Sequence, residues 1–157
     1  MKILILVRHA QAVDKSPVIS DHDRPLTSHW IKQSKKLSKL LKKLDIEPDH
    51  AISSTANRCH DTAKQLCKKF DLKLHSDENL FFKGVDPYLD DITTATDNIQ
   101  SLMIVWHNDD LTDLISLLLR CNFPLVAKWS ATVIEFDVES WTEIKKTQWI
   151  IKYYITA

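Results

Sequence analysis

Two apolar runs without polar alternation do most to constrain the fold of this chain. Residues 3–7 read Ile-Leu-Ile-Leu-Val, and residues 102–106 read Leu-Met-Ile-Val-Trp. An unbroken run of this kind is typical of a strand buried on both faces, as in a parallel sheet. The first run stops at Arg8 and His9, and the second stops at His107. Because ligands bind beyond the carboxyl ends of strands in open α/β sheets, both ends are candidate positions for a site.

The segment between the two runs predicts helices alternating with short strands. Apolar residues recur at helical spacing with lysines between them; they are Trp30, Ile31, Leu37, Leu40, Leu41 and Leu44. Residues 49–53 read as a short strand, and residues 72–74 as another. Between them, Ser54 or Thr55 could cap a helix that runs to about Phe70.

The second half of the chain continues this pattern. Asp86-Pro87 predicts a helix start, because Pro is favoured at the first helical position. A helix opening at Asn108 carries apolar residues over 111–118, and residues 132–138 and 149–155 fit two late strands. Strands alternating with helices indicate the α/β class. We therefore expect a three-layer α/β/α sandwich with a mainly parallel sheet, formed by residues 1–157 as a single domain.

Composition excludes two common ways of binding phosphate. The chain has one glycine, Gly84, where average usage of about 7% predicts around ten. Neither a P-loop nor a dinucleotide-binding glycine loop can be built from it. Side chains must therefore hold any phosphate. Lys and Arg number 21, as do Asp and Glu, so we expect no global attraction to nucleic acid or to an acidic membrane.

Other sequence features favour a cytoplasmic protein. No apolar stretch approaches the roughly 20 residues of a membrane span, and the N-terminal run is too short for a signal peptide. The three cysteines, Cys59, Cys67 and Cys121, are odd in number and form no CxxC pair. We expect them to be reduced thiols.

Two histidines and an arginine are predicted to meet at one sheet edge. His9 and His107 each follow a buried strand, and Arg58 lies near the start of the helix after another strand. Taken singly, Arg58 could be a surface arginine and His107 a structural histidine; their joint placement favours a site. A neutral imidazole can attack phosphorus, while guanidinium groups stabilise the charge on phosphoryl oxygens. Metal-ligand spacing such as HExxH is absent, so we expect no metal and no cofactor.

Four segments resemble the motifs of a known family. Residues 6–10 read LVRHA, residues 23–27 DRPLT, residues 53–63 SSTANRCHDTA and residues 106–111 WHNDDL. In order and spacing they resemble the RHA, RPLT, SSxxxRxxxTA and GHNxxL motifs of the histidine phosphatase superfamily, which has the phosphoglycerate mutase-like fold. The short chain, without a large insertion, resembles the SixA-like branch of phosphohistidine phosphatases.

The resemblance implies a role for each matching residue. His9 is implied to be the phosphorylated nucleophile, with Arg8, Arg58 and His107 binding the phosphoryl oxygens. Arg24 is implied to line the pocket mouth and touch the substrate. Asn108 is a further substrate-binding candidate, although we favour a role in capping the helix after His107.

The chain also departs from the family motifs. Trp106 replaces the motif glycine before His107, and we expect its ring to fill the core rather than narrow the pocket. Asp109 and Asp110 follow Asn108 in place of Pro-Gly. Two carboxylates could weaken anion binding, but we expect them to lie in the first turn of the helix, where they interact favourably with its positive N-terminus.

A general acid is not evident from the residues alone. Glu78, Asp86 and Asp23 are candidates that the sequence does not separate. The resemblance to the SixA-like branch implies an active site without a strong general acid. A phosphohistidine P–N bond is labile once its nitrogen is protonated, so an added acid is less needed.

The sequence thus predicts a metal-independent phosphatase acting through phospho-His9, with a phosphohistidine protein of a signalling system as substrate. The expected partner is a phosphorylated protein, such as a histidine-containing phosphotransfer domain, or a small phosphomonoester. Two alternatives stay open: a small-molecule phosphomonoesterase or mutase of the same superfamily, and a non-catalytic module that binds phosphoproteins.

Overall fold

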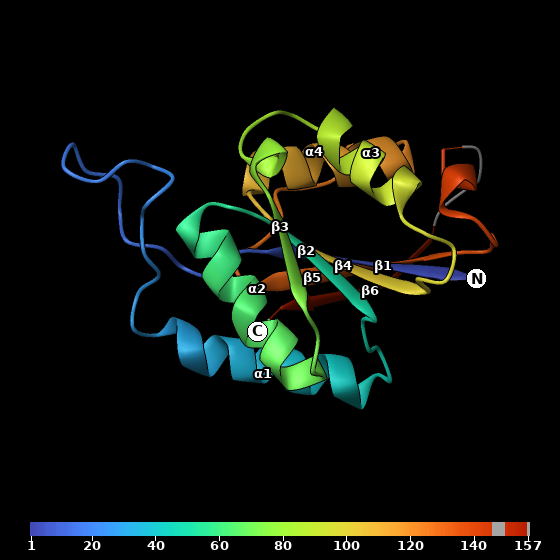
Figure 1. The fold of residues 1–157 in the computed structure, drawn as a ribbon, viewed down its shortest axis with the longest axis horizontal. Helices are drawn as coiled ribbons and strands as arrows, with labels where there is room; N and C mark the ends of the chain where they lie inside the picture. The colour runs from blue at the N-terminus through green and yellow to red at the C-terminus, as the bar shows by residue number, and fades with distance from the viewer. Residues whose placement is uncertain (146–149, 157) are drawn as a thin grey trace.

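The computed structural model describes residues 1–145 and 150–156, which form one six-stranded sheet between two layers of helices (Figure 1). The strand order is β3-β2-β4-β1-β5-β6. The strands are β1 (Lys2–Arg8), β2 (His50–Ser54), β3 (Leu74–Asp77), β4 (Ser101–Trp106), β5 (Ser130–Phe136) and β6 (Ile150–Thr156). The last expected strand began at Trp149, which lies outside the described residues.

The sheet is mainly parallel, as the apolar runs predicted. Strands β1 and β4 pair in parallel, as do β2 and β4 and also β2 and β3. At the other end of the sheet, β5 pairs antiparallel with both β1 and β6. The predicted α/β class and the three-layer sandwich with a mainly parallel sheet are confirmed.

Helices cover both faces of the sheet, which explains the unbroken apolar runs. They are α1 (Trp30–Lys43), α2 (Asn57–Phe70), α3 (Asp86–Thr94) and α4 (Asn108–Leu119), with short 3-10 turns at Glu78–Leu80 and Trp141–Glu143. Figure 1 shows α1 and α2 on one face and α3 and α4 on the other. Ile5 and Val7 pack into the cluster that includes Leu37 of α1. Leu4 and Leu6 pack into the cluster that includes Leu114 of α4. Each such fully buried side chain stabilises the fold by roughly 1.5–3 kcal/mol.

Two predicted helix caps are wrong. Helix α2 begins at Asn57 with Ala56 as its N-cap, and helix α4 begins at Asn108 itself, with His107 as N-cap. Neither cap residue makes a side-chain capping bond. The Ser54 hydroxyl accepts from the backbone N–H of Ala56 at 3.3 Å, before the helix begins, and lies 3.2 Å from Nε2 of His107, inside the site. The predicted helix start at Asp86-Pro87 is confirmed.

The connections that follow β1 and β4 leave the sheet on opposite faces. Helix α1, which follows β1, packs on one face of the sheet, and helix α4, which follows β4, packs on the other. At such a switch point the two connections diverge, and ligands of open α/β sheets commonly bind beyond the carboxyl ends of the strands there. This edge receives His9 and His107.

A long connection, residues 11–29, joins β1 to α1; we call it the arm. It projects beyond the sheet edge as the blue loop at the left of Figure 1. Isolated bridges join Ala12 to Leu26 at its base and Ser16 to Ile19 near its tip. No helix in the described part of the chain is long and apolar enough to cross a membrane.

Candidate active site

The four residues expected to form the phosphate site do lie together, and we call them the floor: Arg8, His9, Arg58 and His107. Arg8 ends β1, His107 follows β4, and Arg58 stands in the first turn of α2. The backbone N–H of His9 donates to the carbonyl of Trp106 at 3.0 Å, which ties the two strand ends together. The two imidazole centroids are 5.7 Å apart, and Arg58 Nη2 lies 3.0 Å from Nδ1 of His107.

His9 is held in the tautomer that a nucleophile requires. Its Nδ1 lies 2.6 Å from the carbonyl oxygen of Ala10. A carbonyl only accepts, so Nδ1 carries the proton and donates it. The lone pair is therefore on Nε2. The backbone N–H of Ala10 donates to Thr62 Oγ1 at 3.1 Å, which fixes this turn against α2.

The surroundings keep His9 neutral. Its side chain is 9% exposed, and burial together with the charges of Arg58, Arg8 and Arg24 lowers its pKa to about 3, although the bond to Ala10 opposes this. A cationic imidazole beside three guanidinium groups is unfavourable both because it is desolvated and because like charges repel. His9 is thus neutral near pH 7, with its one ring proton on Nδ1.

His107 is neutral for similar reasons, and both its ring nitrogens are engaged. Burial, then the nearby Arg58 charge and His9, lower its pKa to about 2. Arg58 can only donate, so Nδ1 accepts and Nε2 carries the hydrogen that faces Ser54 Oγ. The Cys59 thiol also lies 3.6 Å from both nitrogens. In this arrangement His107 holds Arg58 in place, and it must release a partner to reach a phosphoryl oxygen.

Arg8 precedes His9 at the end of β1, and its guanidinium group is held by the segment that follows α4. Its Nη1 donates to the carbonyl of Val126. Burial lowers the pKa of Arg8, while the nearby carboxylate of Asp109 raises it. Arg8 acts on His9 electrostatically, since its charge contributes to the low pKa of the imidazole.

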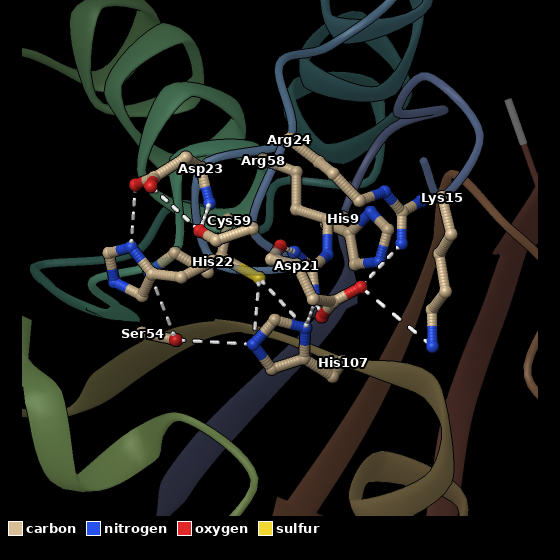
Figure 2. A network of polar contacts seen from close by, with 12 residues as sticks. His9, Lys15, Asp21, His22, Asp23, Arg24, Ser54, Arg58, Cys59 and His107 are labelled. Atoms are coloured by element: carbon tan, nitrogen blue, oxygen red, sulfur yellow. Dashed lines mark hydrogen bonds and ion pairs between the residues drawn. The ribbon is translucent and has the colours of Figure 1, made fainter. Parts of the chain in front are cut away.

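The arm adds charged residues above the floor, one of which the sequence analysis missed. Arg24 donates from Nε to the carbonyl of Val13 at 2.9 Å and from Nη1 to Asp21 Oδ1 at 2.7 Å. Asp21 Oδ2 also pairs with Arg58 Nη2 at 2.9 Å. Figure 2 shows Asp21 amid His9, Arg24, Arg58 and His107. The only sequence signal for Asp21 is its position three residues before Arg24.

An aromatic wall, also missed, lines the side of the site. The Phe82 ring stacks on the imidazole of His107, with centroids 4.6 Å apart and an interplanar angle of 23°. Phe81 meets the same imidazole edge-on at 5.5 Å. The Arg58 guanidinium lies 5.8 Å from the Phe82 centroid and 6.0 Å from that of Phe81. The adjacent aromatic pair before Gly84 was the available sequence signal.

The three general-acid candidates differ in position. Asp23 is exposed, and its carboxylate accepts from Ser20 Oγ and faces His22. Asp86 is exposed at the start of α3. Only Glu78 borders a cavity next to the wall, of about 340 Å³, which is also lined by His22, Thr55, Asn79, Phe81 and Lys83.

The motif departures lie in the core and at the start of α4. Trp106 is fully buried in the core, as expected. Asp109 and Asp110 lie in the first turn of α4, as expected. Asn108 starts that helix, and its Nδ2 lies 3.5 Å from Asp109 Oδ1, so its predicted capping role is wrong. Within the described residues, no group of three or more His, Cys, Asp and Glu side chains could hold a metal ion.

Comparison with known proteins bears on the family and the fold. The family model for the histidine phosphatase superfamily (branch 1) matches residues 4–81. An uncharacterized chloroplastic protein of Arabidopsis thaliana is 25% identical over 89% of this chain and 69% of its own length.

Solved structures share the fold. SixA from Agrobacterium tumefaciens superposes with a TM-score of 0.83 at 23% identity, covering 99% of both chains. The protein histidine phosphatase SixA in complex with tungstate gives a TM-score of 0.79 at 17% identity, covering 98% of this chain and 96% of that one. Motif order, site geometry and the match of the family model lead to one conclusion: the chain belongs to the histidine phosphatase superfamily and has a SixA-like fold.

Proposed function

We propose that this protein is a phosphatase that forms a covalent phosphohistidine intermediate on His9. The observation that carries the proposal is the state of that imidazole. Its Nδ1 donates to Ala10, its pKa is lowered to about 3, and its unprotonated Nε2 lies at the edge where Arg58 and Arg24 bring positive charge. A neutral nucleophile beside cationic donors is what attack on an anionic phosphoryl group requires.

The reaction has two displacements at phosphorus. The His9 Nε2 lone pair forms an N–P bond while the bond from phosphorus to the leaving group breaks, and the leaving group takes up a proton. Water then forms an O–P bond, the N–P bond breaks, and the water proton is released as phosphate leaves. The guanidinium groups of Arg58 and Arg8 stabilise the charge on the equatorial oxygens in both steps.

The substrate we propose is a phosphohistidine in a partner protein. Of the three candidate acids, Asp23 has its carboxylate turned to Ser20 and His22, and Asp86 is exposed at a helix start. A P–N bond breaks readily once its nitrogen is protonated, so this substrate does not depend on a strong general acid. The SixA structures with the same fold are named for this activity. The free thiols Cys59, Cys67 and Cys121 suit a reducing, cytoplasmic setting.

A second candidate is a small-molecule phosphomonoesterase. The cavity beside Phe81 has a volume of about 340 Å³ and carries Glu78, Lys83 and His22 on its lining. A cavity of this size fits a small leaving group, and Glu78 could protonate a leaving oxygen there.

One experiment tests these functions. Wild type, His9→Ala and His60→Ala are incubated with a phosphorylated histidine phosphotransfer domain and with p-nitrophenyl phosphate, and phosphate release is measured. His60 is a matched control because it is a half-exposed histidine paired with Asp61 on α2. We expect His60→Ala to retain turnover and His9→Ala to lose it by about 10⁴-fold or more.

The outcomes separate the candidates. No turnover of either substrate by wild type would reject the enzyme and favour a phosphoprotein-binding module. Turnover that survives in His9→Ala would reject the nucleophile. A kcat/KM higher for p-nitrophenyl phosphate than for the phosphoprotein would favour the phosphomonoesterase, and mass spectrometry of acid-labile phosphate on His9 would test the intermediate.

A further inference from the structure

The carboxylate of Asp21 contacts the same cations that the proposed phosphoryl substrate would need. Its Oδ2 is 2.9 Å from Arg58 Nη2, and its Oδ1 is 2.7 Å from Arg24 Nη1 and 3.8 Å from Lys15 Nζ. The backbone carbonyl of Asp21 also accepts from Arg58 Nη1. The dashed lines in Figure 2 show this carboxylate joined to Arg24 and Lys15. A loop residue thus contacts a floor arginine through both its side chain and its backbone.

These contacts leave Arg58 Nη2 with no free N–H to donate to another anion. An Nη atom carries two hydrogens. One faces Asp21 Oδ2, and the other faces Nδ1 of His107. The Arg58 side chain is only 2% exposed, so it has little freedom to turn a different edge outward. A phosphoryl oxygen can therefore reach Nη2 only if Asp21 or His107 gives way.

Asp21 is the partner better placed to leave. His107 is fully buried and packed between Phe82, Ser54 and Cys59. The Asp21 side chain is 28% exposed and stands on the arm, whose tip residues are exposed. Moving it outward breaks polar contacts and uncovers no apolar core. A phosphoryl dianion also brings more charge and more acceptor oxygens than a carboxylate, so it gains more from the same guanidinium groups.

We propose that Asp21 is an internal competitor for Arg24 and Arg58, which together we call the arginine clamp. Its carboxylate occupies the clamp until a phosphoryl group displaces it. The proposal rests on the function proposed above, because it takes the clamp to be the phosphoryl site. It assigns the arm a regulatory role: the arm sets how strongly an oxyanion must bind before it enters. Because the anion must displace Asp21, the contact raises the apparent Kd of every tetrahedral oxyanion.

An alternative role for Asp21 predicts the opposite sign. If the carboxylate only positions Arg58 and Arg24 for substrate, its removal would disorder the clamp and weaken oxyanion binding. If it is a competitor, its removal frees the clamp and strengthens binding. The direction of the change in Kd separates the two roles.

The test is calorimetric titration with tungstate, a tetrahedral dianion, on wild type, Asp21→Asn, Asp21→Ala and Asp14→Asn. Asp14 is an exposed carboxylate on the same arm, so its variant controls for the loss of one negative charge. We expect the Kd for tungstate to be about tenfold lower in Asp21→Asn and Asp21→Ala than in wild type, which corresponds to about 1.4 kcal/mol of binding free energy. We expect Asp14→Asn to stay within twofold of wild type.

An unchanged or weaker affinity in both Asp21 variants would overturn the proposal, as would an equal gain in Asp14→Asn. Circular dichroism and thermal unfolding of each variant establish that the protein is folded. Binding is measured without turnover, so the two proposals fail separately. A protein that binds tungstate in the expected order yet hydrolyses no phosphorylated substrate would reject the phosphatase and keep the competitor.

Discussion

The floor and the arm bring charge to one site by different physical means. The floor residues end strands or begin a helix, and His9, Arg58 and His107 are all buried. The arm residues Lys15, Asp21 and Arg24 come from one long connection with isolated bridges and partly exposed side chains. Sheet pairing and core packing hold the first group, whereas hydrogen bonds and ion pairs hold the second. Core packing therefore fixes the positions of the catalytic groups, whereas the arm, a segment that moves more easily, controls access to them.

Hydrogen exchange gives the largest expected contrast between the two regions. Amides of β1, such as those of Ile5 and Leu6, pair on both sides with β4 and β5 and should open only with global unfolding. Amides at the arm tip, such as those of Val18 and Ile19, should open locally at almost no cost in free energy. We expect β1 amides to exchange at least about 10³-fold more slowly, as measured by mass spectrometry. Equal protection in the tip would contradict the division.

Replacing Arg58 with Ala should reduce kcat by about 10²–10³-fold, the effect of removing one preorganised donor to a developing anion. The change also leaves Asp21 and His107 without their shared donor. Steady-state kinetics with p-nitrophenyl phosphate measures it. Arg58→Lys keeps the charge but loses the planar guanidinium, so its kcat should lie between those of wild type and Arg58→Ala. This variant keeps the prediction testable if Arg58→Ala misfolds.

The matched arm variant is Arg24→Ala. Arg24 contacts Val13 and Asp21 rather than His107, so we expect kcat/KM to change by less than about tenfold. A loss in Arg24→Ala as large as that in Arg58→Ala would break the distinction between floor and arm.

The floor should also make stability depend on pH. The folded pKa values of His9 and His107 are about 3 and about 2, whereas an unfolded histidine has a pKa near 6.5. Above about pH 6.5 both states are neutral and stability is fully present. As pH falls below that value, the unfolded state binds protons that the folded state does not, so stability is lost at up to about 1.4 kcal/mol per pH unit for each histidine.

Urea unfolding at several pH values between 5 and 7 measures this slope. His9→Gln should reduce it by about half, while His60→Gln, altered at a half-exposed position, should leave it nearly unchanged. A slope that is identical in wild type and His9→Gln would show that His9 is protonated in the folded state.

Lys15→Ala should have the smallest effect. Its side chain is 79% exposed and its Nζ lies 3.8 Å from Asp21 Oδ1, and exposed pairs of this kind contribute little. We expect kcat/KM and tungstate affinity to change by less than about twofold. A larger change, tested at low and at high salt, would mean that the arm is held by Lys15 and is less free than its exposure indicates.

Much of the fold and the floor could be predicted because the signals are local. An apolar run such as residues 102–106 marks a buried strand wherever it occurs, and the residue after it necessarily stands at the sheet edge. Helix starts were less predictable: Ser54 and Asn108 have good capping side chains, but tertiary contacts use the Ser54 hydroxyl for His107. The segment that became the arm showed no periodicity, and Asp21 meets Arg58 across 37 positions of sequence, so its contact had no local signal.

By itself, the sequence determined the α/β class, the positions of His9 and His107 after two buried strands, and the need for side chains to hold phosphate, since the chain has a single glycine. These follow from hydrophobic periodicity and residue chemistry, which act over short distances. Only the tertiary structure decided which tautomer His9 adopts, that Phe81 and Phe82 wall the site, and that Asp21 engages the arginines. The tautomer depends on the backbone geometry at Ala10, and the other two outcomes depend on contacts between segments far apart in the sequence, which form only once the chain has packed.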